Sequence, residues 1–296
     1  MIFVATLIWG TAFAAQRTGM EHVGPFTFIS VRFFIGGCVT MAAAPLFARL
    51  NKNVKRENAT LSSLFNKKTI ISGLLCGSAL FIASTLQQTG IQTTTAGKAG
   101  FLTSLYVIVV PVAGLFLRRI PRFWVWPGVI LAVAGTYLLC MESGLTINTG
   151  DTLILLCAVF FAAHILLIDR FAGDCDGIAI SSVQFFVVSA AAIVPMFIFE
   201  TPEISGILAA APAILYTGVL SCGVAYTLQI KAQQITSPAV ASILFSMESV
   251  FAALAGYLFI SEHLSARELR GCALVLAAII VAQIPAKAPF LRAKKS

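Results

Sequence analysis

The sequence predicts an all-α, polytopic membrane protein of ten transmembrane helices, built as two inverted five-helix repeats. Three observations support this prediction: an apolar composition, a series of long uncharged stretches, and an internal repeat. Of the 296 residues, 58% are hydrophobic and only 11% are charged, whereas a water-soluble domain carries about 25% charged residues. No stretch alternates apolar and polar residues with a period of two, so the pattern does not indicate a membrane β-barrel.

The helices are predicted from the apolar stretches, because a helix rises 1.5 Å per residue and crosses a hydrocarbon core of ~30 Å with about 20 residues. We predict membrane spans at about residues 2–16, 26–47, 69–88, 98–117, 123–141, 151–168, 179–199, 208–230, 237–259 and 267–285. The seven cysteines show no CxxC spacing. We therefore predict no metal site, no disulfide and no cofactor.

Lysine and arginine residues indicate the orientation, because cytoplasmic loops retain them. If the N-terminus is cytoplasmic, the cytoplasmic set is Arg49, Lys52, Lys55, Arg56, Lys67, Lys68, Arg118, Arg119, Arg122, Arg170, Lys231, Lys287, Arg292, Lys294 and Lys295, and the external set is Arg17, Lys98, Arg267 and Arg270. This bias predicts a multi-pass protein of the cell inner or plasma membrane with both termini cytoplasmic and with membrane lipids as partners. The basic residues are dispersed and lack interleaved aromatics, so we predict no nucleic-acid partner.

The two halves of the chain match each other in order and spacing. Leu7–Ala15 (LIWGTAFAA) matches Leu155–Ala163 (LLCAVFFAA), and SVRFF at 30–34 matches SVQFF at 182–186. Residues 85–117 align without a gap to residues 227–259. We predict a first repeat at 1–145, a second repeat at 146–286, and a basic cytoplasmic tail at 287–296. The alternative is chance similarity between apolar helices.

An odd number of helices in each repeat has a topological consequence. A repeat of five helices ends on the opposite side of the membrane from where it began, so the second copy must be inverted. Many secondary transporters use inverted repeats around a central site. Arg32 in the first repeat corresponds to Gln184 in the second, so the two entrances to such a site would differ in charge.

Several stretches resemble the EamA-type family of the drug/metabolite transporter superfamily. They are LIWGTAFA, VRFF, TTAGKAGFLTSLYVIVVP, MESVFAALAGYLFISEHLS and GCALVLAAIIVA, and the resemblance covers essentially the whole chain. It implies a secondary transporter that exports or exchanges a small metabolite, such as an amino acid or a related compound, by alternating access. The family pattern often has proline after the glutamate of the ninth span, whereas Ser249 follows Glu248 here. This departure leaves open whether that helix is kinked.

Ionisable residues within the predicted spans are candidates for function, because burial in lipid is costly unless they face a cavity or a partner. Glu248 could bind a proton or contact a cation in a central cavity, or it could be a structural carboxyl group between helices. Arg32 could bind a substrate carboxylate through its planar fork, or its long stem could carry the charge to the outer interface. We expect His164 to hydrogen-bond a neighbouring helix rather than to relay protons.

Polar and aromatic residues of the predicted spans complete the candidate site. Polar groups could line a cavity or hold helices together, and aromatic side chains could form its apolar walls. The predicted substrate-binding residues are Trp9, Arg32, Gln87, Phe101, Thr103, Tyr106, Gln184, Tyr226, Gln229, Ser246 and Glu248. The predicted partners are a small-molecule substrate and a proton as coupling ion, and the predicted assembly is a monomer or a homodimer.

Two other classes of function compete with transport. An intramembrane enzyme would need a nucleophile–base pair or a metal cluster at membrane depth, and the sequence has no HExxH motif and no paired aspartates in its spans. A non-transporting sensor or scaffold is the other alternative. No Walker A motif is present, so we predict that the chain does not hydrolyse ATP and uses a substrate or ion gradient. From the missing catalytic motifs we predict that it is not an enzyme and has no catalytic residue.

Overall fold

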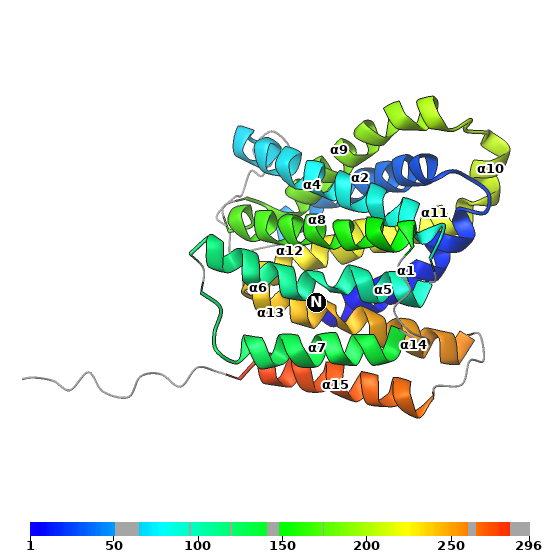
Figure 1. Cartoon of the computed structure of the whole chain (residues 1–296). Helices are drawn as coiled ribbons and strands as arrows, with labels where there is room; N and C mark the ends of the chain where they lie inside the picture. The colour runs from blue at the N-terminus through cyan, green and yellow to red at the C-terminus, as the bar shows by residue number, and fades with distance from the viewer. Residues whose placement is uncertain are drawn as a thin grey trace, which may run out of the picture.

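The computed structural model of the chain describes residues 1–50, 65–94, 96–118, 120–140, 148–173, 175–259 and 265–284. These residues form a bundle of helices that lie roughly side by side, and no strand occurs among them (Figure 1). The predicted tail at 287–296 and the predicted loop residues Lys52, Lys55, Arg56 and Arg119 lie outside the described part. The helices are α1 (Ile2–Gly19), α2 (Pro25–Leu50), α4 (Lys67–Ile91), α5 (Ala96–Ser104), α6 (Tyr106–Phe116), α7 (Val125–Cys140), α8 (Thr149–Phe171), α9 (Gly177–Phe199), α10 (Ile204–Ala209), α11 (Ala211–Leu215), the π-helix η1 (Tyr216–Tyr226), α12 (Thr227–Gln233), α13 (Pro238–Phe245), α14 (Met247–Phe259) and α15 (Ala266–Ala282).

The all-helical part of the prediction is confirmed, and many of the helices have the length and composition of membrane spans. Among the described residues, two shorter apolar helices cover Val125–Leu139 and Pro238–Ala252. α1 and α15 coincide with predicted spans but fall in neither group, so a total of ten spans stays a prediction. Within the described ranges, six segments are long and apolar enough to cross a bilayer: Pro25–Pro45, Lys67–Ile91, Ala99–Phe116, Thr149–Phe171, Gly177–Phe199 and Ala211–Gln233.

Polar side chains determine where several helices begin. Asn148 and Asp151 form a capping box at the start of α8, and Ser265 and Glu268 form another at the start of α15. Asp176 caps α9 by accepting two backbone N–H hydrogen bonds. The first N–H groups of a helix have no partner within it, so these caps stabilise the observed boundaries.

Helices α2 and α9 pack in opposite directions and exchange reciprocal contacts. Ser189 Oγ donates to the Ser30 carbonyl at 2.9 Å, and Ser182 Oγ donates to the Gly37 carbonyl at 3.3 Å. In the internal alignment Ser30 and Gly37 correspond to Ser182 and Ser189. Each contact therefore maps onto the other when the two halves are exchanged, as across a two-fold axis.

Helices α7 and α15 also make reciprocal contacts, and their backbones approach each other closely. A Cβ added to Gly135 would lie 2.8 Å from the Gly271 carbonyl oxygen, and a Cβ added to Gly128 would lie 3.2 Å from the Ala278 carbonyl oxygen. The internal alignment pairs Gly128 with Gly271, and the same register pairs Gly135 with Ala278. Close approach of two helix backbones requires small residues of this kind.

Two helical segments are interrupted at matching positions. The first break separates α5 from α6, and the second separates α13 from α14. Ser104 Oγ donates to the Phe101 carbonyl at 2.7 Å, and Ser246 Oγ donates to the Ile243 carbonyl at 2.6 Å. Such hydroxyl-to-backbone bonds often bend helices. The helix that follows the first break contains a proline, Pro111 in α6, whereas α14, which follows the second, contains none, so a proline after the break is not the common cause.

The described part exposes many large apolar side chains and buries a few ionisable ones. Phe116, Phe199 and Ile204 are 85%, 73% and 78% exposed, whereas Arg32 and Glu248 are 4% and 5% exposed. A soluble protein rarely exposes so many large apolar side chains, whereas lipid favours them and drives ionisable groups toward the interior. The chain is therefore a multi-pass membrane protein.

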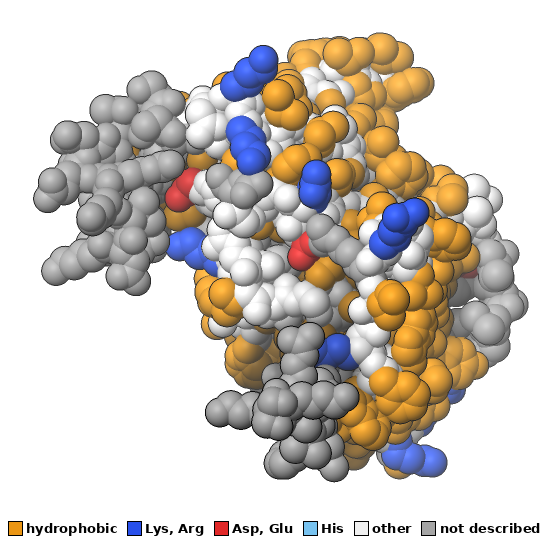
Figure 2. Space-filling model, turned by 90° about the vertical axis from the view of Figure 1, so that its left-hand side faces the viewer, with side chains coloured by type: hydrophobic (Ala, Val, Ile, Leu, Met, Phe, Trp, Pro, Cys, Tyr) orange, Lys and Arg blue, Asp and Glu red, His pale blue; other side chains and the backbone are white. Residues whose placement is uncertain are grey.

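Lysine and arginine side chains gather at one end of the bundle, with apolar side chains around its sides (Figure 2). Figure 2 faces the left-hand end of Figure 1, where α4 begins and where α8 and α12 end. Lys67 begins α4, and Arg170 and Lys231 lie in the last turns of α8 and α12. This end carries residues of the predicted cytoplasmic set.

Candidate functional site

A cavity of about 60 Å³ lies among helices of both halves of the chain. Its volume leaves room for only a few water molecules. Helices α1, α2, α4, α5 and α6 contribute from the first half, and α8, η1, α12, α13 and α14 contribute from the second. The lining residues are Trp9, Ala12, Phe13, Gln16, Arg32, Phe33, Gln87, Thr103, Tyr106, Phe161, His164, Ile165, Ser221, Cys222, Tyr226, Gln229, Phe245 and Glu248.

The cavity brings together most of the residues predicted from the sequence to bind substrate. Phe101 instead packs edge-on against Tyr137, with ring centroids 5.7 Å apart. Ser246 bonds to the backbone of its own helix, and Gln184 lies behind the lining residue His164. These three therefore do not line the cavity. The predicted residues that do are Trp9, Arg32, Gln87, Thr103, Tyr106, Tyr226, Gln229 and Glu248.

Arg32 places a positive charge on the cavity. Its Nη1 donates to Gln16 Oε1 at 2.7 Å, and its guanidinium carbon lies 4.9 Å from the centroid of the Phe33 ring. Its Nε has no hydrogen-bond partner, and no carboxylate of the described residues forms an ion pair with it. The head group is thus held inside the bundle rather than carried to the surface by its stem. A buried cation without a counter-charge is costly. Binding of an anion next to Arg32 would therefore be favourable.

Glu248 lies in the first turn of α14 and accepts a hydrogen bond from Tyr106 Oη at 3.4 Å. These two residues are 142 positions apart and correspond to each other in the internal alignment. α1 passes close by, because a Cβ added to Gly10 would lie 2.5 Å from the Glu248 carbonyl oxygen. The carboxyl group therefore lies between the two halves, at matched positions directly after the two helix breaks.

Trp9 forms the centre of an aromatic wall. Its ring packs edge-on against Tyr226 and Phe245, with centroids 5.0 and 5.7 Å apart. Trp9 Nε1 and Gln229 Oε1 are buried and have no hydrogen-bond partner. Buried polar atoms are rarely left unpaired. One free donor and one free acceptor next to the cavity are consistent with a polar ligand.

His164 also lines the cavity, and its Nε2 lies 3.0 Å from Gln184 Oε1 on α9. The expected hydrogen bond to a neighbouring helix is therefore confirmed. The lining residues that the sequence analysis did not select include Gln16, Phe161, Ser221 and Phe245. One signal could have found Gln16 and His164, because each directly follows the aligned stretches LIWGTAFAA and LLCAVFFAA.

The lining contains both members of several matched pairs of the internal alignment. If the central cavity lies where the two halves meet, matched residues should face it from both sides, and they do. The pairs are Phe13 with Phe161, Gln16 with His164, Gln87 with Gln229, Thr103 with Phe245, and Tyr106 with Glu248.

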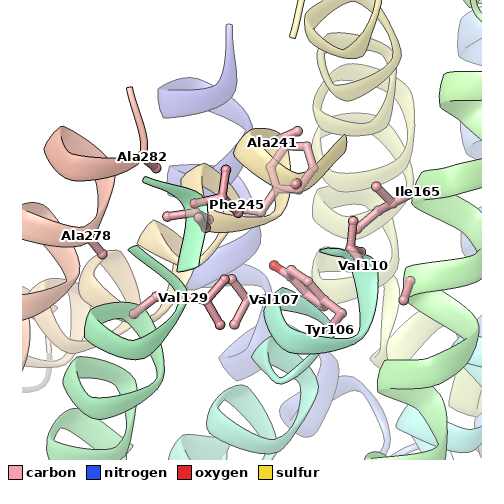
Figure 3. Packing of buried hydrophobic residues seen from close by; sticks show 14 of the residues in the cluster. Tyr106, Val107, Val110, Val129, Ile165, Ala241, Phe245, Ala278 and Ala282 are labelled. Atoms are coloured by element: carbon pink, nitrogen blue, oxygen red, sulfur yellow. The ribbon is translucent and has the colours of Figure 1, made fainter. Parts of the chain in front are cut away.

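A second, larger hollow of about 600 Å³ lies toward the basic end and includes Arg122 in its lining. An apolar cluster (Figure 3) contributes side chains to the lining of both spaces. Tyr106 and Phe245 of this cluster line the central cavity, whereas Val110 and Ala239 line the hollow. The two spaces are thus separated by about one turn of packed side chains.

No group of three or more His, Cys, Asp or Glu side chains that could hold a metal ion occurs among the described residues. The cavity lining offers amide, hydroxyl, imidazole, guanidinium and carboxyl groups. This donor and acceptor set suits a small polar molecule.

A helical membrane bundle with an apolar exterior and a central cavity that carries charged groups is the architecture of membrane transport proteins. The chain belongs to the EamA-like transporter family, whose sequence model matches residues 1–141 and 148–283. This match confirms the resemblance found in the sequence.

Relatives and a solved structure agree with this assignment. An uncharacterized transporter of Archaeoglobus fulgidus is 30% identical over 285 residues, which cover 95% of this chain and 84% of the relative. The uncharacterized transporter YwfM of Bacillus subtilis is 28% identical over 95% of this chain and 91% of its own length. One crystal structure, 20% identical, superposes with a TM-score of 0.74 over 95% of this chain and 94% of that one, and shows that the fold is shared.

Proposed function

We propose that this protein is a secondary transporter of the inner or plasma membrane that exports or exchanges a small metabolite, such as an amino acid or a related compound. One observation carries the proposal: Arg32 lines a buried cavity and forms no ion pair among the described residues. A guanidinium presents a planar fork that matches a carboxylate. A carboxylate on the substrate would supply the missing anion.

An amino acid fits the remaining chemistry of the cavity. Its carboxylate would bind Arg32 and the free N–H of Trp9, and its ammonium group would bind Glu248 and the free oxygen of Gln229. Aromatic side chains around Trp9 would enclose the apolar part. The other predicted site residues Gln87, Thr103, Tyr106 and Tyr226 line the same cavity.

The inverted repeat is part of the proposal, with repeats at 1–145 and 146–286. Three observations support it: the reciprocal contacts of α2 with α9, those of α7 with α15, and the matched pairs that line the cavity. Two halves related by a two-fold axis in the membrane plane would give two equivalent ways to open the centre.

Alternating access would begin at the apolar cluster of Figure 3. The central cavity is too small for a metabolite, so the helices must move apart before one enters. Separation of α6 from α13 within this cluster would join the cavity to the hollow at the basic end, which we assign to the cytoplasm by the positive-inside rule. Transport would draw on a substrate or proton gradient, with Glu248 as the proton-binding group.

Counterflow in proteoliposomes tests the proposal. Purified protein is reconstituted with an unlabelled amino acid inside, and uptake of the same amino acid in labelled form is followed across a panel, with protein-free liposomes as the control. We expect transient accumulation of at least one member of the panel. If folded protein exchanges none of them, the proposed function is wrong.

A further inference from the structure

The second half of the chain carries a polar pair at the position where the first half carries Gln16 and Arg32. His164 corresponds to Gln16, and Gln184 corresponds to Arg32. Both pairs link the first and second helices of their repeat, through contacts of 2.7 Å and 3.0 Å. The hydrogen bond is thus duplicated, although neither matched position keeps its residue type.

The second pair leaves one imidazole nitrogen free. In this structure the Gln184 amide turns Oε1 toward the ring and leaves its own Nε2 without a partner. An amide oxygen can only accept, so in this orientation His164 Nε2 carries the proton. In a neutral imidazole the other nitrogen, Nδ1, is then an acceptor. That atom is buried and has no partner, and the His164 side chain is 0% exposed.

The His164 ring is contacted by Gln184 and by Tyr226. Gln184 is itself 0% exposed and lies behind the lining, and the Tyr226 ring packs edge-on against His164 with centroids 5.9 Å apart. An unpaired acceptor on a cavity-lining residue leaves a hydrogen bond for a ligand to complete, because buried acceptors are costly when they stay unpaired.

We infer that His164 is a substrate-contacting residue whose Nδ1 accepts a hydrogen bond from a hydroxyl or amide group of the substrate, and that Gln184 is its positioning residue. This inference rests on the proposed transport function. In that proposal Arg32 and Glu248 bind the carboxylate and the ammonium group of the substrate. His164 adds a third contact, which is made to the side chain of the amino acid and so distinguishes one amino acid from another. The preferred substrate therefore carries a donor in its side chain.

The proton position can be measured without any substrate. The chain has three histidines, so isotope-labelled histidine gives a simple nitrogen NMR spectrum of the protein in lipid nanodiscs, and loss of a signal in His164→Gln assigns the site. We expect neutral His164 with the proton on Nε2. A proton on Nδ1 overturns the inference. Gln184→Leu should convert the signal to a mixture of the two tautomers, which a purely packing role for Gln184 would not do.

Selectivity is then measured by competition in counterflow. L-serine and L-asparagine carry side-chain donors, and L-alanine and L-leucine serve as their donor-free counterparts. In the wild type the donor-bearing compounds should compete about tenfold more strongly, as expected for one hydrogen bond. His164→Phe keeps an aromatic ring but has no nitrogen acceptor, so it should abolish this preference.

His22→Phe is the matched control, because His22 is an exposed histidine outside the cavity. It should leave both the preference and the His164 signal unchanged. If the wild type exchanges amino acids without preferring the donor-bearing ones, this inference fails while the proposed function stands. If the wild type exchanges none of the compounds, the proposed function fails and the inference fails with it.

Discussion

The Gln16–Arg32 pair and the His164–Gln184 pair occupy matching places in the two halves, yet only the first is charged. In the first pair the residue on the second helix donates the hydrogen bond, and in the second pair the residue on the second helix accepts it. The position of the contact is shared while its chemistry is not. The helices thus meet in the same way in both halves, and in the proposed function a substrate would meet a cation from one half and a neutral acceptor from the other.

Arg32→Gln removes this difference by giving both halves a neutral second residue. Loss of a charge-assisted hydrogen bond to a substrate carboxylate should weaken transport of amino acids by about 10- to 100-fold. Competition by the corresponding amino acid amides, which lack the carboxylate, should change far less. Counterflow with both series measures the two effects.

Arg32→Lys is the matched control, since it keeps the charge and loses the planar fork. It should retain part of the transport that Arg32→Gln loses. Equal losses for amino acids and amides in Arg32→Gln would show that Arg32 holds the helices together rather than binding an anion.

Glu248→Gln tests the second difference between the halves, because the matched residue Tyr106 is uncharged. The variant keeps the hydrogen bond from Tyr106 but cannot bind a proton or hold a negative charge. We expect transport to fall about tenfold, as for one lost charge interaction, and its dependence on pH to flatten. A rate and pH profile identical to the wild type in counterflow at several pH values would rule out the titrating role.

Gly10→Ala tests whether α1 must approach α14 more closely than α8 approaches α6, the matched pair of helices. The matched residue in the second half is already alanine, Ala158. A new Cβ on Gly10 would lie 2.5 Å from the Glu248 carbonyl oxygen, and such overpacking costs about 1 kcal/mol or more. We expect the thermal unfolding midpoint to fall by a few degrees. An unchanged midpoint would mean that α1 shifts freely.

Ser246→Ala and Ser104→Ala compare the two helix breaks. Each variant removes one hydroxyl-to-backbone hydrogen bond, which contributes about 0.5–1 kcal/mol. Both should have small effects on unfolding, and Ser246→Ala should lower transport more, because Glu248 follows its break by two residues. A larger transport loss in Ser104→Ala would contradict this expectation and would show that the first break matters more for transport than the second.

Much of the fold could be predicted from the sequence, because in lipid each helix must form its own backbone hydrogen bonds and must turn apolar side chains toward the lipid. Capping residues such as Asp176 and Ser265 mark helix starts. Spacing also located many of the cavity residues, since polar groups such as Gln87 and Gln229 are rare in apolar spans and recur at matched positions.

Only the tertiary structure decided which face of each helix meets the cavity. In a span that is apolar all round, periodicity cannot separate a lipid-facing or packed side chain from a cavity-facing one, so Phe101 and Phe245 look alike in sequence although only Phe245 lines the site. The same limit left the position of the Arg32 head group open. Its hydrogen bond to Gln16 is a contact between two helices, and such contacts depend on how the helices pack rather than on either helix alone.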